Sequence, residues 1–321
     1  MRIIYLGTPQ LATIPLAALA NIPGIEIVAV ITQPDRPSGR GRQLTPPPVK
    51  IMAQDLGIAT ILQPETLKDD AVVAQIAALE PDMGVVAAYG EILRKNVLAI
   101  PRHGYLNIHP SLLPLHRGPA PVTSAILAGD HDVGVSVIQL GSKMDAGPIL
   151  AQHRRPMPSD ARAGTLTEAL FHVGAQMLCD VIMPYAAGTL IPTPQDEQFA
   201  SYIGLLSRDN GRIDWHQPAT TIERMIRAYD PWPGTHTTVL GQPLRILQAS
   251  FTNITGNHTP GSVIDGVDGV VVVCGQGALL LLHVQPAGGK AMVASDWRRG
   301  LRSLPVFGEP NLPLPGTHFN G

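Results

Sequence analysis

The chain has 321 residues, and its 23 lysines and arginines against 25 aspartates and glutamates give a formal net charge of −2. That balance excludes a globally basic, histone-like nucleic-acid binder, although it leaves room for a local basic patch. With 45% hydrophobic and 15% charged residues, the chain can bury a sizeable core and is not disordered by composition. Its length favours two domains of ~150 residues each, and its 32 glycines and 31 prolines indicate many ordered turns.

The number of cysteines and the lengths of the apolar runs indicate the cellular compartment of the protein. Cys179 and Cys274 are too few for a disulfide framework or a cysteine metal site, so both are expected as buried free thiols. The apolar run at the N-terminus is too short for a signal peptide. Uninterrupted runs such as Val270–Cys274 and Ala278–Leu282 fall short of the ~18 residues of a membrane span. We therefore expect a soluble, cytoplasmic protein without membrane contact.

The first two thirds of the chain alternate short apolar runs with helical patterns. Buried parallel strands are expected at Ile3–Leu6, Ile25–Thr32, Met83–Ala88, Tyr105–Ile108 and Val133–Leu140. Helices are expected at Ala12–Asn21, Val49–Leu56, Asp69–Leu79, Leu93–Ile100, Pro121–Ala128 and Thr165–Met183. Strands that alternate with helices predict a doubly wound α/β fold around a mostly parallel sheet.

From about Gly188 the pattern changes. Ile191–Pro194 is typical of an extended linker, and Thr220–Glu223 fits a capping box that opens a helix at Ile222–Ala228. Beyond that helix only strands are expected, at Thr235–Leu240, Leu244–Phe251, Gly261–Ile264, Val270–Cys274 and Ala278–Val284. These short antiparallel strands predict a small barrel, with the OB-fold as the leading candidate. We place an α/β domain at residues 1–188, a linker at 189–207 and the barrel domain at 208–315.

Three polar residues at the expected sheet edge could do chemistry together. Asn107 and His109 are two residues apart at the end of the fourth expected strand, so both project to one side, at the edge where open α/β sheets bind ligands. Asp145 follows the fifth expected strand, from where it could reach His109, raise the pKa of the imidazole and orient the ring. The amide could stabilise an oxyanion and the imidazole could transfer protons.

Each of these residues also has a purely structural interpretation. Asn107 and His109 could bond the backbone of a turn, and Asp145 alone fits an Asx turn. The three together at one edge favour a catalytic site. The segment Pro34–Lys50 adds charge at the same edge, because it carries three arginines and a lysine against one aspartate. Those positive charges favour phosphate contacts over a merely solvated surface.

Several other motifs are excluded. Gly7-Thr8-Pro9 lacks the G-x-G-x-x-G pattern of dinucleotide binding, and neither a P-loop nor a G-x-S-x-G motif occurs. His103, His109 and His116 come without a cluster of carboxylates or cysteines, so we expect no metal site.

These residues resemble a known family, the 10-formyltetrahydrofolate-dependent formyltransferases. Asn107-x-His109, the following Ser111-Leu112-Leu113-Pro114 and Asp145 in Met-Asp-Ala-Gly match the catalytic signature of that family. The resemblance runs in colinear order from about residue 1 to 300. Residues 32–42, 213–215, 227–234 and 285–292 are similar to members whose formyl acceptor is methionyl-initiator tRNA. One departure is that Gly204 and Leu205 stand in a segment where the family usually places a lysine, for which Arg208 could substitute.

The resemblance implies a Rossmann-like catalytic domain followed by an OB-like tRNA-binding domain, in an enzyme of translation initiation. Separately from the resemblance, we expect a monomer. The formyl donor would be 10-formyltetrahydrofolate, the acceptor the α-amine of methionyl-initiator tRNA, and no metal would take part. Asn107 and His109 would stabilise the oxyanion, while Asp145 would orient His109 and help to move a proton. Folate would contact Ala88, Tyr89, Gly90, Ile92, Ser111, Leu112, Leu113 and Pro114. The tRNA would contact Arg36, Arg40, Arg42, Lys50 and Arg208.

Three alternatives stay open. A formyltransferase for an amino sugar or nucleotide would keep the same three signature residues, but the basic loop and the barrel argue against that acceptor. A non-catalytic RNA-binding protein would have no need of Asn107, His109 and Asp145 together. A nucleotide-dependent oxidoreductase is disfavoured by the missing glycine fingerprint.

Overall fold

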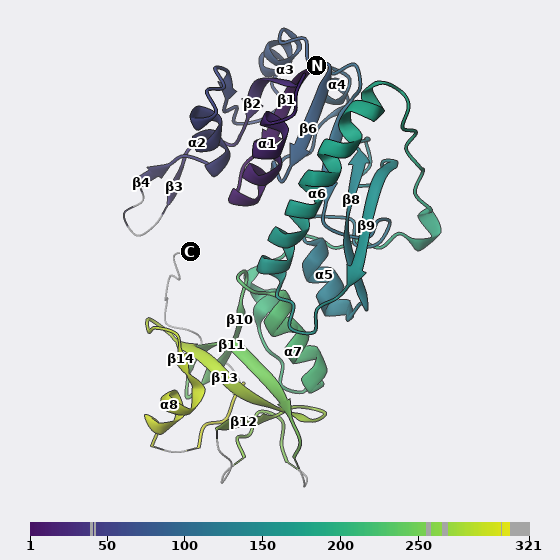
Figure 1. Ribbon diagram of the computed structural model, residues 1–321. Helices are drawn as coiled ribbons and strands as arrows, with labels where there is room; N and C mark the ends of the chain where they lie inside the picture. The colour runs from purple at the N-terminus through teal and green to yellow at the C-terminus, as the bar shows by residue number, and fades with distance from the viewer. Residues whose placement is uncertain (39–40, 42, 255–257, 265–268, 303, 309–321) are drawn as a thin grey trace.

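The computed structural model describes residues 1–38, 41, 43–254, 258–264, 269–302 and 304–308. Its first part is built on a seven-stranded sheet with the order β5-β2-β1-β6-β7-β8-β9 (Figure 1). The strands are β1 (Arg2–Gly7), β2 (Glu26–Ile31), β5 (Ile61–Leu62), β6 (Met83–Ala87), β7 (Tyr105–His109), β8 (Asp132–Gln139) and β9 (Ile149–Pro156). The α/β fold with a mostly parallel sheet is confirmed.

One strand of this sheet, β8, runs against the others, and β9 runs in the direction of the parallel strands. The strands β5, β2, β1, β6 and β7 pair in parallel, whereas β8 is antiparallel to β7 and β9 is antiparallel to β8. The expectation that the fifth strand is parallel is therefore wrong. The six central residues of β8 are buried, which gives this antiparallel strand the apolar composition of a parallel one.

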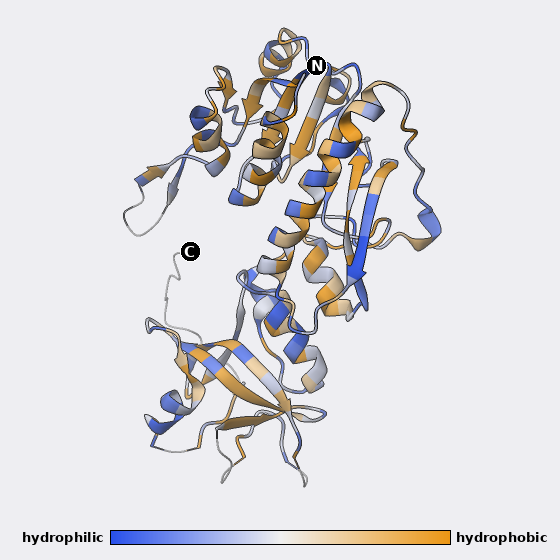
Figure 2. Cartoon of the chain, viewed as in Figure 1, coloured by the Kyte–Doolittle hydropathy of each residue, from blue (hydrophilic) through white to orange (hydrophobic). Residues whose placement is uncertain are grey.

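Helices cover both faces of the sheet. They are α1 (Thr13–Ala20), α2 (Pro48–Asp55), α3 (Asp70–Ala77), α4 (Lys95–Leu98), α5 (Pro121–Ala128) and α6 (Ala163–Ala186). Alternate residues of β1 enter two different cores. Ile3 and Tyr5 pack with α1, α2, α5 and α6, whereas Ile4 and Leu6 pack on the other face with α3 and α4. Figure 2 shows the resulting apolar strands between amphipathic helices.

The helix α6 is long and apolar enough, by length and composition, to cross a membrane. No uninterrupted apolar run marks it in the sequence, because polar residues such as Glu168 and Gln176 interrupt it. Its buried residues, among them Leu170 and Leu178, belong to the core beneath the sheet. Packing against the sheet therefore accounts for the apolar face of this helix.

The second part of the chain is a small curled sheet with two helices. It contains α7 (Ala219–Ala228), β10 (Thr235–Val239), β11 (Gln242–Thr252), β12 (Val270–Val273), β13 (Ala278–Pro286), β14 (Met292–Val293) and α8 (Ala294–Arg299). The strand order is β10-β11-β13-β12, and β14 also pairs with β13. Single bridges then join Val272 to Val263, Ser262 to Val306 and Phe307 to Val239. These bridges close the ring from β12 back to β10 around a second core.

Some expectations for this part are wrong. The helix α8 lies where only strands are expected, and residues 261–264 form isolated bridges rather than a strand. The expected capping box is absent as well. The helix α7 begins at Ala219, its N-cap Pro218 makes no side-chain cap bond, and the carboxylate of Glu223 instead accepts from Arg227 at 2.6 and 2.8 Å.

The two parts meet where α5 and α7 pack together. Arg162 donates to the carboxylate of Asp230 at 2.7 Å and to the carbonyl of Leu247 at 2.7 Å. The hydroxyl of Thr123 donates to the carbonyl of Ala228 at 3.1 Å. Domain limits at residues 188, 207 and 315 stay a prediction, and the last of them lies outside the described residues.

Candidate active site

The strand β7 places Asn107 and His109 together. Leu106 and Ile108 point into the core beneath α6, so by alternation Asn107 and His109 project from the opposite face. Asn107 is half-buried and His109 is buried. The two side chains therefore share one face at the carboxyl end of the parallel strands, as the sequence predicts.

Asp145 reaches His109 by a route that the sequence does not predict. Because β8 is antiparallel to β7, its last residue, Gln139, pairs with Leu106, while Ser136 pairs with His109. The loop after β8 therefore starts beside the beginning of β7 and must turn back. A hydrogen bond of 3.0 Å from the amide of Gln139 to the carbonyl of Pro148 closes the base of this loop. Asp145 itself has a φ of 49°, a left-handed conformation that costs energy in a non-glycine residue.

The contacts of His109 define its protonation. Its Nε2 lies 3.0 Å from the carbonyl oxygen of His116, which can only accept, so Nε2 carries a hydrogen. Its Nδ1 lies 3.7 Å from Oδ2 of Asp145, an ion-pair distance that is too long for a hydrogen bond. The same Oδ2 accepts from the amide of Gly118 at 2.8 Å. In the neutral ring, Nδ1 is thus an unprotonated nitrogen beside a carboxylate.

Burial decides the basicity of His109. Burial lowers the pKa of the imidazole below its usual value, and the Asp145 carboxylate and the bond to the His116 carbonyl only partly offset that effect. Asp145 raises the pKa of His109, as expected, but burial has the larger effect. The lowered pKa favours the neutral ring, and an added proton on Nδ1 would face the carboxylate.

The neighbouring ring of His116 is held differently. Its Nδ1 lies 2.8 Å from Oγ of Ser124, and its Nε2 lies 2.7 Å from Oδ2 of Asp130. Both nitrogens are therefore engaged by side chains. His116 also has a left-handed φ of 58°, so these two bonds fix a residue whose backbone is strained.

The loop after β7 is fixed from within. The hydroxyl of Ser111 donates to the carbonyl of Leu115 at 2.7 Å, and the hydroxyl of Ser136 donates to the carbonyl of Ser111 at 2.7 Å. Gln152 donates to the carbonyl of Leu113 at 2.9 Å. Ser111, Leu112 and Leu113 are buried and Pro114, after a cis peptide bond, is half-buried. The predicted folate contacts in this loop therefore form a rigid wall.

The other predicted folate contacts follow β6, the strand beside β7. Ala88 and Gly90 are exposed and have φ values of 47° and 95°, and 72% of Ile92 is exposed. Tyr89 is buried, its hydroxyl has no hydrogen-bond partner, and burial raises the pKa of that hydroxyl. The structure thus places these residues at the same sheet edge as His109.

The predicted tRNA contacts are distributed unevenly. Arg36 lies in a short hairpin formed by β3 (Arg36–Ser38) and β4 (Gln43–Thr45), which projects from the sheet in Figure 1, and it lies 3.4 Å from Glu65. Lys50 is engaged, because its Nζ lies 2.9 Å from the carboxylate of Asp35. Arg208 is exposed in a 3-10 turn. Arg40 and Arg42 lie outside the described residues.

Comparison with known proteins decides the family. Residues 1–182 match the family model described as formyl transferase, and residues 205–302 match the model of its C-terminal domain. The chain belongs to the formyl transferase family. It is 56% identical to methionyl-tRNA formyltransferase of Herpetosiphon aurantiacus, over 95% of this chain and 99% of that protein. It is 54% identical to methionyl-tRNA formyltransferase of a Roseiflexus species, over 94% and 93%.

A solved structure shows the same fold at low identity. It is the N-formyltransferase of Helicobacter canadensis in complex with folinic acid and dTDP-3-aminofucose. The match has a TM-score of 0.64 at 16% identity and covers 87% of this chain and 97% of that one. The common fold therefore extends over most of this formyl transferase.

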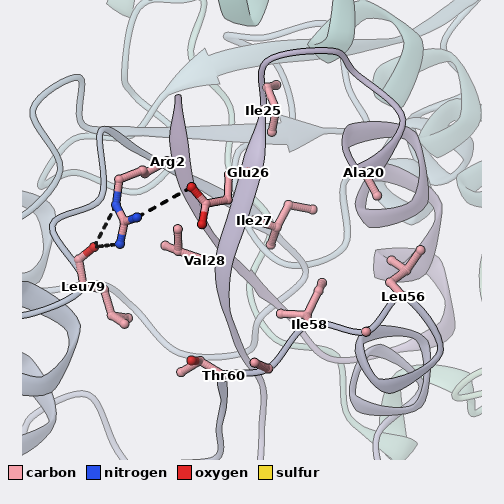
Figure 3. Close-up of a pocket in the computed structure, with 12 residues that line it drawn as sticks. Arg2, Ala20, Ile25, Glu26, Ile27, Val28, Leu56, Ile58, Thr60 and Leu79 are labelled. Carbon is pink, nitrogen blue, oxygen red and sulfur yellow. Dashed lines mark hydrogen bonds and ion pairs between the residues drawn. The ribbon is translucent and has the colours of Figure 1, made fainter.

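The pocket in Figure 3 lies elsewhere on this formyl transferase. Arg2 and Glu26, which line it, begin β1 and β2, so it opens at the edge opposite to His109. Arg2 donates to the carbonyl of Leu79 at 2.8 Å and lies 3.6 Å from Glu26. Predicted site residues are absent from its lining. Within the described ranges, no group of three His, Cys, Asp or Glu side chains could hold a metal ion.

Sequence reasoning missed several polar residues that hold the site. Four side chains make hydrogen bonds that hold the loops around His109 and Asp145. They are Ser136, Gln152, Arg117 and Gln195. None of them stands in a motif, and Gln195 lies 50 residues from the aspartate whose carbonyl it bonds. No signal in the sequence points to them, because an arginine or a glutamine is ordinarily exposed.

Proposed function

We propose that this chain transfers the formyl group of 10-formyltetrahydrofolate to the α-amino group of methionyl-initiator tRNA. The observation that carries the proposal is the 56% identity, over nearly the full length of both chains, to a methionyl-tRNA formyltransferase. The Asn107, His109 and Asp145 cluster supplies the chemistry that this reaction needs. The enzyme acts as a monomer in the cytoplasm, where translation begins.

The reaction exchanges one bond to the formyl carbon for another. The neutral α-amine attacks that carbon, a tetrahedral oxyanion forms, and the bond from the carbon to N10 of folate breaks. One proton leaves the amine and one arrives at N10, so the net proton count does not change. Asn107 donates its amide hydrogen to the oxyanion, since a neutral donor aimed at developing charge stabilises it.

His109 and Asp145 move the proton. The unprotonated Nδ1 of the neutral ring accepts a proton from the attacking amine, and the carboxylate at 3.7 Å stabilises the imidazolium that results. The same proton then passes to N10. Because burial keeps the pKa of His109 low, the ring releases the proton readily.

The substrates occupy the two sides of this centre. The folate ring lies against Ala88, Tyr89, Gly90 and Ile92 and against the wall formed by Ser111–Pro114, both of which border the carboxyl edge of the sheet. The acceptor stem contacts Arg36 on the β3–β4 hairpin together with Arg40 and Arg42, which lie outside the described residues, and Arg208 contacts a further phosphate. Lys50 supports this surface through Asp35 rather than by direct contact.

One assay tests the proposal. The purified chain is incubated with 10-formyltetrahydrofolate and methionyl-initiator tRNA, and formyl-methionine released from the tRNA is measured. Charged elongator tRNA is the control for acceptor choice, and a dTDP-amino sugar is the control for the alternative acceptor. Formylation of initiator tRNA above both controls supports the proposal, whereas formylation of the sugar alone replaces it with the alternative.

A further inference from the structure

The segment from 193 to 203, here called the linker strap, is bonded directly to the loops of the candidate site. Thr193 and Ile149, the first residue of β9, exchange two backbone hydrogen bonds of 2.8 Å. Further on, the amide of Arg117 donates to the carbonyl of Ser201 at 2.8 Å, and the amide of Ile203 donates to the carbonyl of Arg117 at 2.8 Å. Figure 1 shows this stretch passing beside β9 on its way to α7.

Gln195 is the point where the linker strap touches the loop of Asp145. Its Nε2 donates to the carbonyl of Asp145 at 2.7 Å and to the carbonyl of Gly147 at 2.7 Å. Its Oε1 accepts from Nη2 of Arg117 at 2.8 Å and from Nε of Arg117 at 3.2 Å. The side-chain amide therefore joins the loop after β8 to the loop after β7, with both of its ends engaged.

Arg117 fills the space between the two loops. Its residue is fully buried, and its guanidinium also bonds both carboxylate oxygens of Glu197, at 2.8 and 3.0 Å, and the hydroxyl of Tyr202 at 2.8 Å. The ring of Tyr202 lies 5.5 Å from the guanidinium carbon, within reach of a cation–π contact. Every group that holds this buried charge comes from the linker strap.

The neighbours of Arg117 touch both members of the proton-transfer pair. The carbonyl of His116 accepts from Nε2 of His109 at 3.0 Å, and the amide of Gly118 donates to the carboxylate of Asp145 at 2.8 Å. Asp145 has a left-handed backbone, and a Cβ at Gly147 would collide with the carbonyl of Gln139. The turn is thus strained, and bonds from outside must hold it.

We propose that Gln195 and Arg117 are positioning residues, through which the linker strap sets the carboxylate of Asp145 against His109. They act without touching substrate. Their bonds fix the backbone on each side of the pair, and a displacement of about 1 Å in such a pair can cost about 10²-fold in rate. The linker strap continues into the part of the chain that carries α7. The geometry of His109 and Asp145 therefore depends on how the strap packs against the loops after β7 and β8.

The test uses substitutions at Gln195 in the full chain. Gln195→Glu keeps the acceptor for Arg117 but removes both donors to the carbonyls of Asp145 and Gly147. Gln195→Leu removes all four bonds at similar volume. The matched control is Gln198→Ala, since the hydrogen bonds of this glutamine among the described residues go to Asp196, within the same strap. If either Gln195 variant fails to fold, Glu197→Ala is used instead. It removes the two bonds from the Arg117 guanidinium to the Glu197 carboxylate, and 61% of the Glu197 side chain is exposed, so little packing is lost.

Two readouts separate positioning from a merely structural role. We expect kcat for formylation to fall about 10- to 100-fold in both Gln195 variants, with unchanged KM for both substrates. If the carboxylate of Asp145 moves away from His109, the pKa of that ring should also fall. NMR titration of labelled histidine measures this pKa. A smaller loss of kcat with the same direction of pKa change is expected for Glu197→Ala.

The inference rests on the proposed function, and the experiment keeps the two apart. Formylation by the unmodified chain decides the function, whereas the titration of His109 needs no substrate and decides the positioning. Values of kcat within twofold of the unmodified chain, a rise in KM that matches the loss of kcat, or an unchanged titration of His109 would each overturn the inference.

Discussion

His109 and His116 stand seven residues apart in the chain, and each faces an aspartate, but the two rings are held in opposite ways. His116 bonds Asp130 at 2.7 Å and Ser124 at 2.8 Å, so both of its nitrogens have side-chain partners. His109 bonds one backbone carbonyl and lies 3.7 Å from Asp145. One ring is locked, and the other keeps a nitrogen that can accept a proton.

We call His116 with Asp130 the structural pair and His109 with Asp145 the chemical pair. The contacts of their rings separate the two. A ring whose nitrogens are both bonded by side chains gains a fixed orientation, and neither nitrogen is left for a substrate. A ring with one free nitrogen beside a carboxylate can be protonated and stabilised in place. The structural pair is also useful to the chemical one, because the carbonyl of His116 fixes Nε2 of His109.

The largest effect is expected from breaking the chemical pair. His109→Ala and Asp145→Asn should lower turnover by at least about 10²–10³-fold, the usual cost of one lost group that stabilises the transition state. Both variants should fold, because the 3.7 Å contact contributes little to stability and His109→Ala loses one further bond, to the carbonyl of His116, at about 1–3 kcal/mol. Formylation kinetics and thermal unfolding measure the two effects. Asp160→Asn, an exposed loop residue, serves as control, and near-normal turnover in either variant would reject the assignment.

Breaking the structural pair should instead lower stability. Asp130→Ala leaves Nε2 of the buried His116 without its partner, at a cost of about 1–3 kcal/mol. Turnover should change much less, because His109 is held by the backbone of His116. The control is Asp132→Ala, which breaks an exposed ion pair with Arg154 worth about 0–1 kcal/mol. Equal destabilisation in both variants, measured by urea unfolding, would contradict this distinction.

The sequence predicts that Asn107 and His109 share one edge of the sheet, but not the path that brings Asp145 beside His109. Apolar runs and their alternation with helices predict the sheet and place Asn107 and His109 on its edge. They cannot distinguish parallel from antiparallel pairing in β8, because burial on both faces removes the alternation that would mark it. The strand β9 was missed for the opposite reason, since its second half, His153–Pro156, is polar and largely exposed.

The supports of the site were beyond sequence reasoning. The contact between Arg117 and Gln195 joins residues 78 positions apart, and neither residue type by itself indicates burial. A sequence shows which residues are charged, but which partner neutralises them depends on the folded chain. Lys50 illustrates this point, because the sequence counts it as a free positive charge and the structure pairs it with Asp35.

The pH dependence of stability sharpens the comparison on its chemical side. Burial lowers the pKa of His109 below the usual histidine value of about 6.5, so between the folded-state pKa and the usual value the unfolded chain binds more protons than the folded chain. Stability therefore falls as the pH drops below about 6.5, and His109→Gln should reduce that slope. Urea unfolding at pH 7.5, 6.5 and 5.5 measures it. His236, whose pKa burial also lowers, contributes with the same sign, and an unchanged slope in His109→Gln would contradict the expectation.

The smallest effect is expected at Arg36 and Lys50, the two described basic residues of the segment Pro34–Lys50. The exposure of their ion pairs shows which of the two charges is available to a phosphate. Arg36 and Glu65 form an exposed pair, with 64% and 77% of their side chains exposed, whereas Lys50 and Asp35 are more enclosed, at 21% and 32%. An exposed pair dissociates at little cost, so Arg36 is available to a phosphate. Arg36→Ala should reduce the slope of log Kd against log salt for tRNA by about 0.7–0.9. The double variant Asp35→Asn with Lys50→Met removes a neutral pair and should leave the slope unchanged. An equal reduction by both would show that Lys50 contacts the tRNA directly.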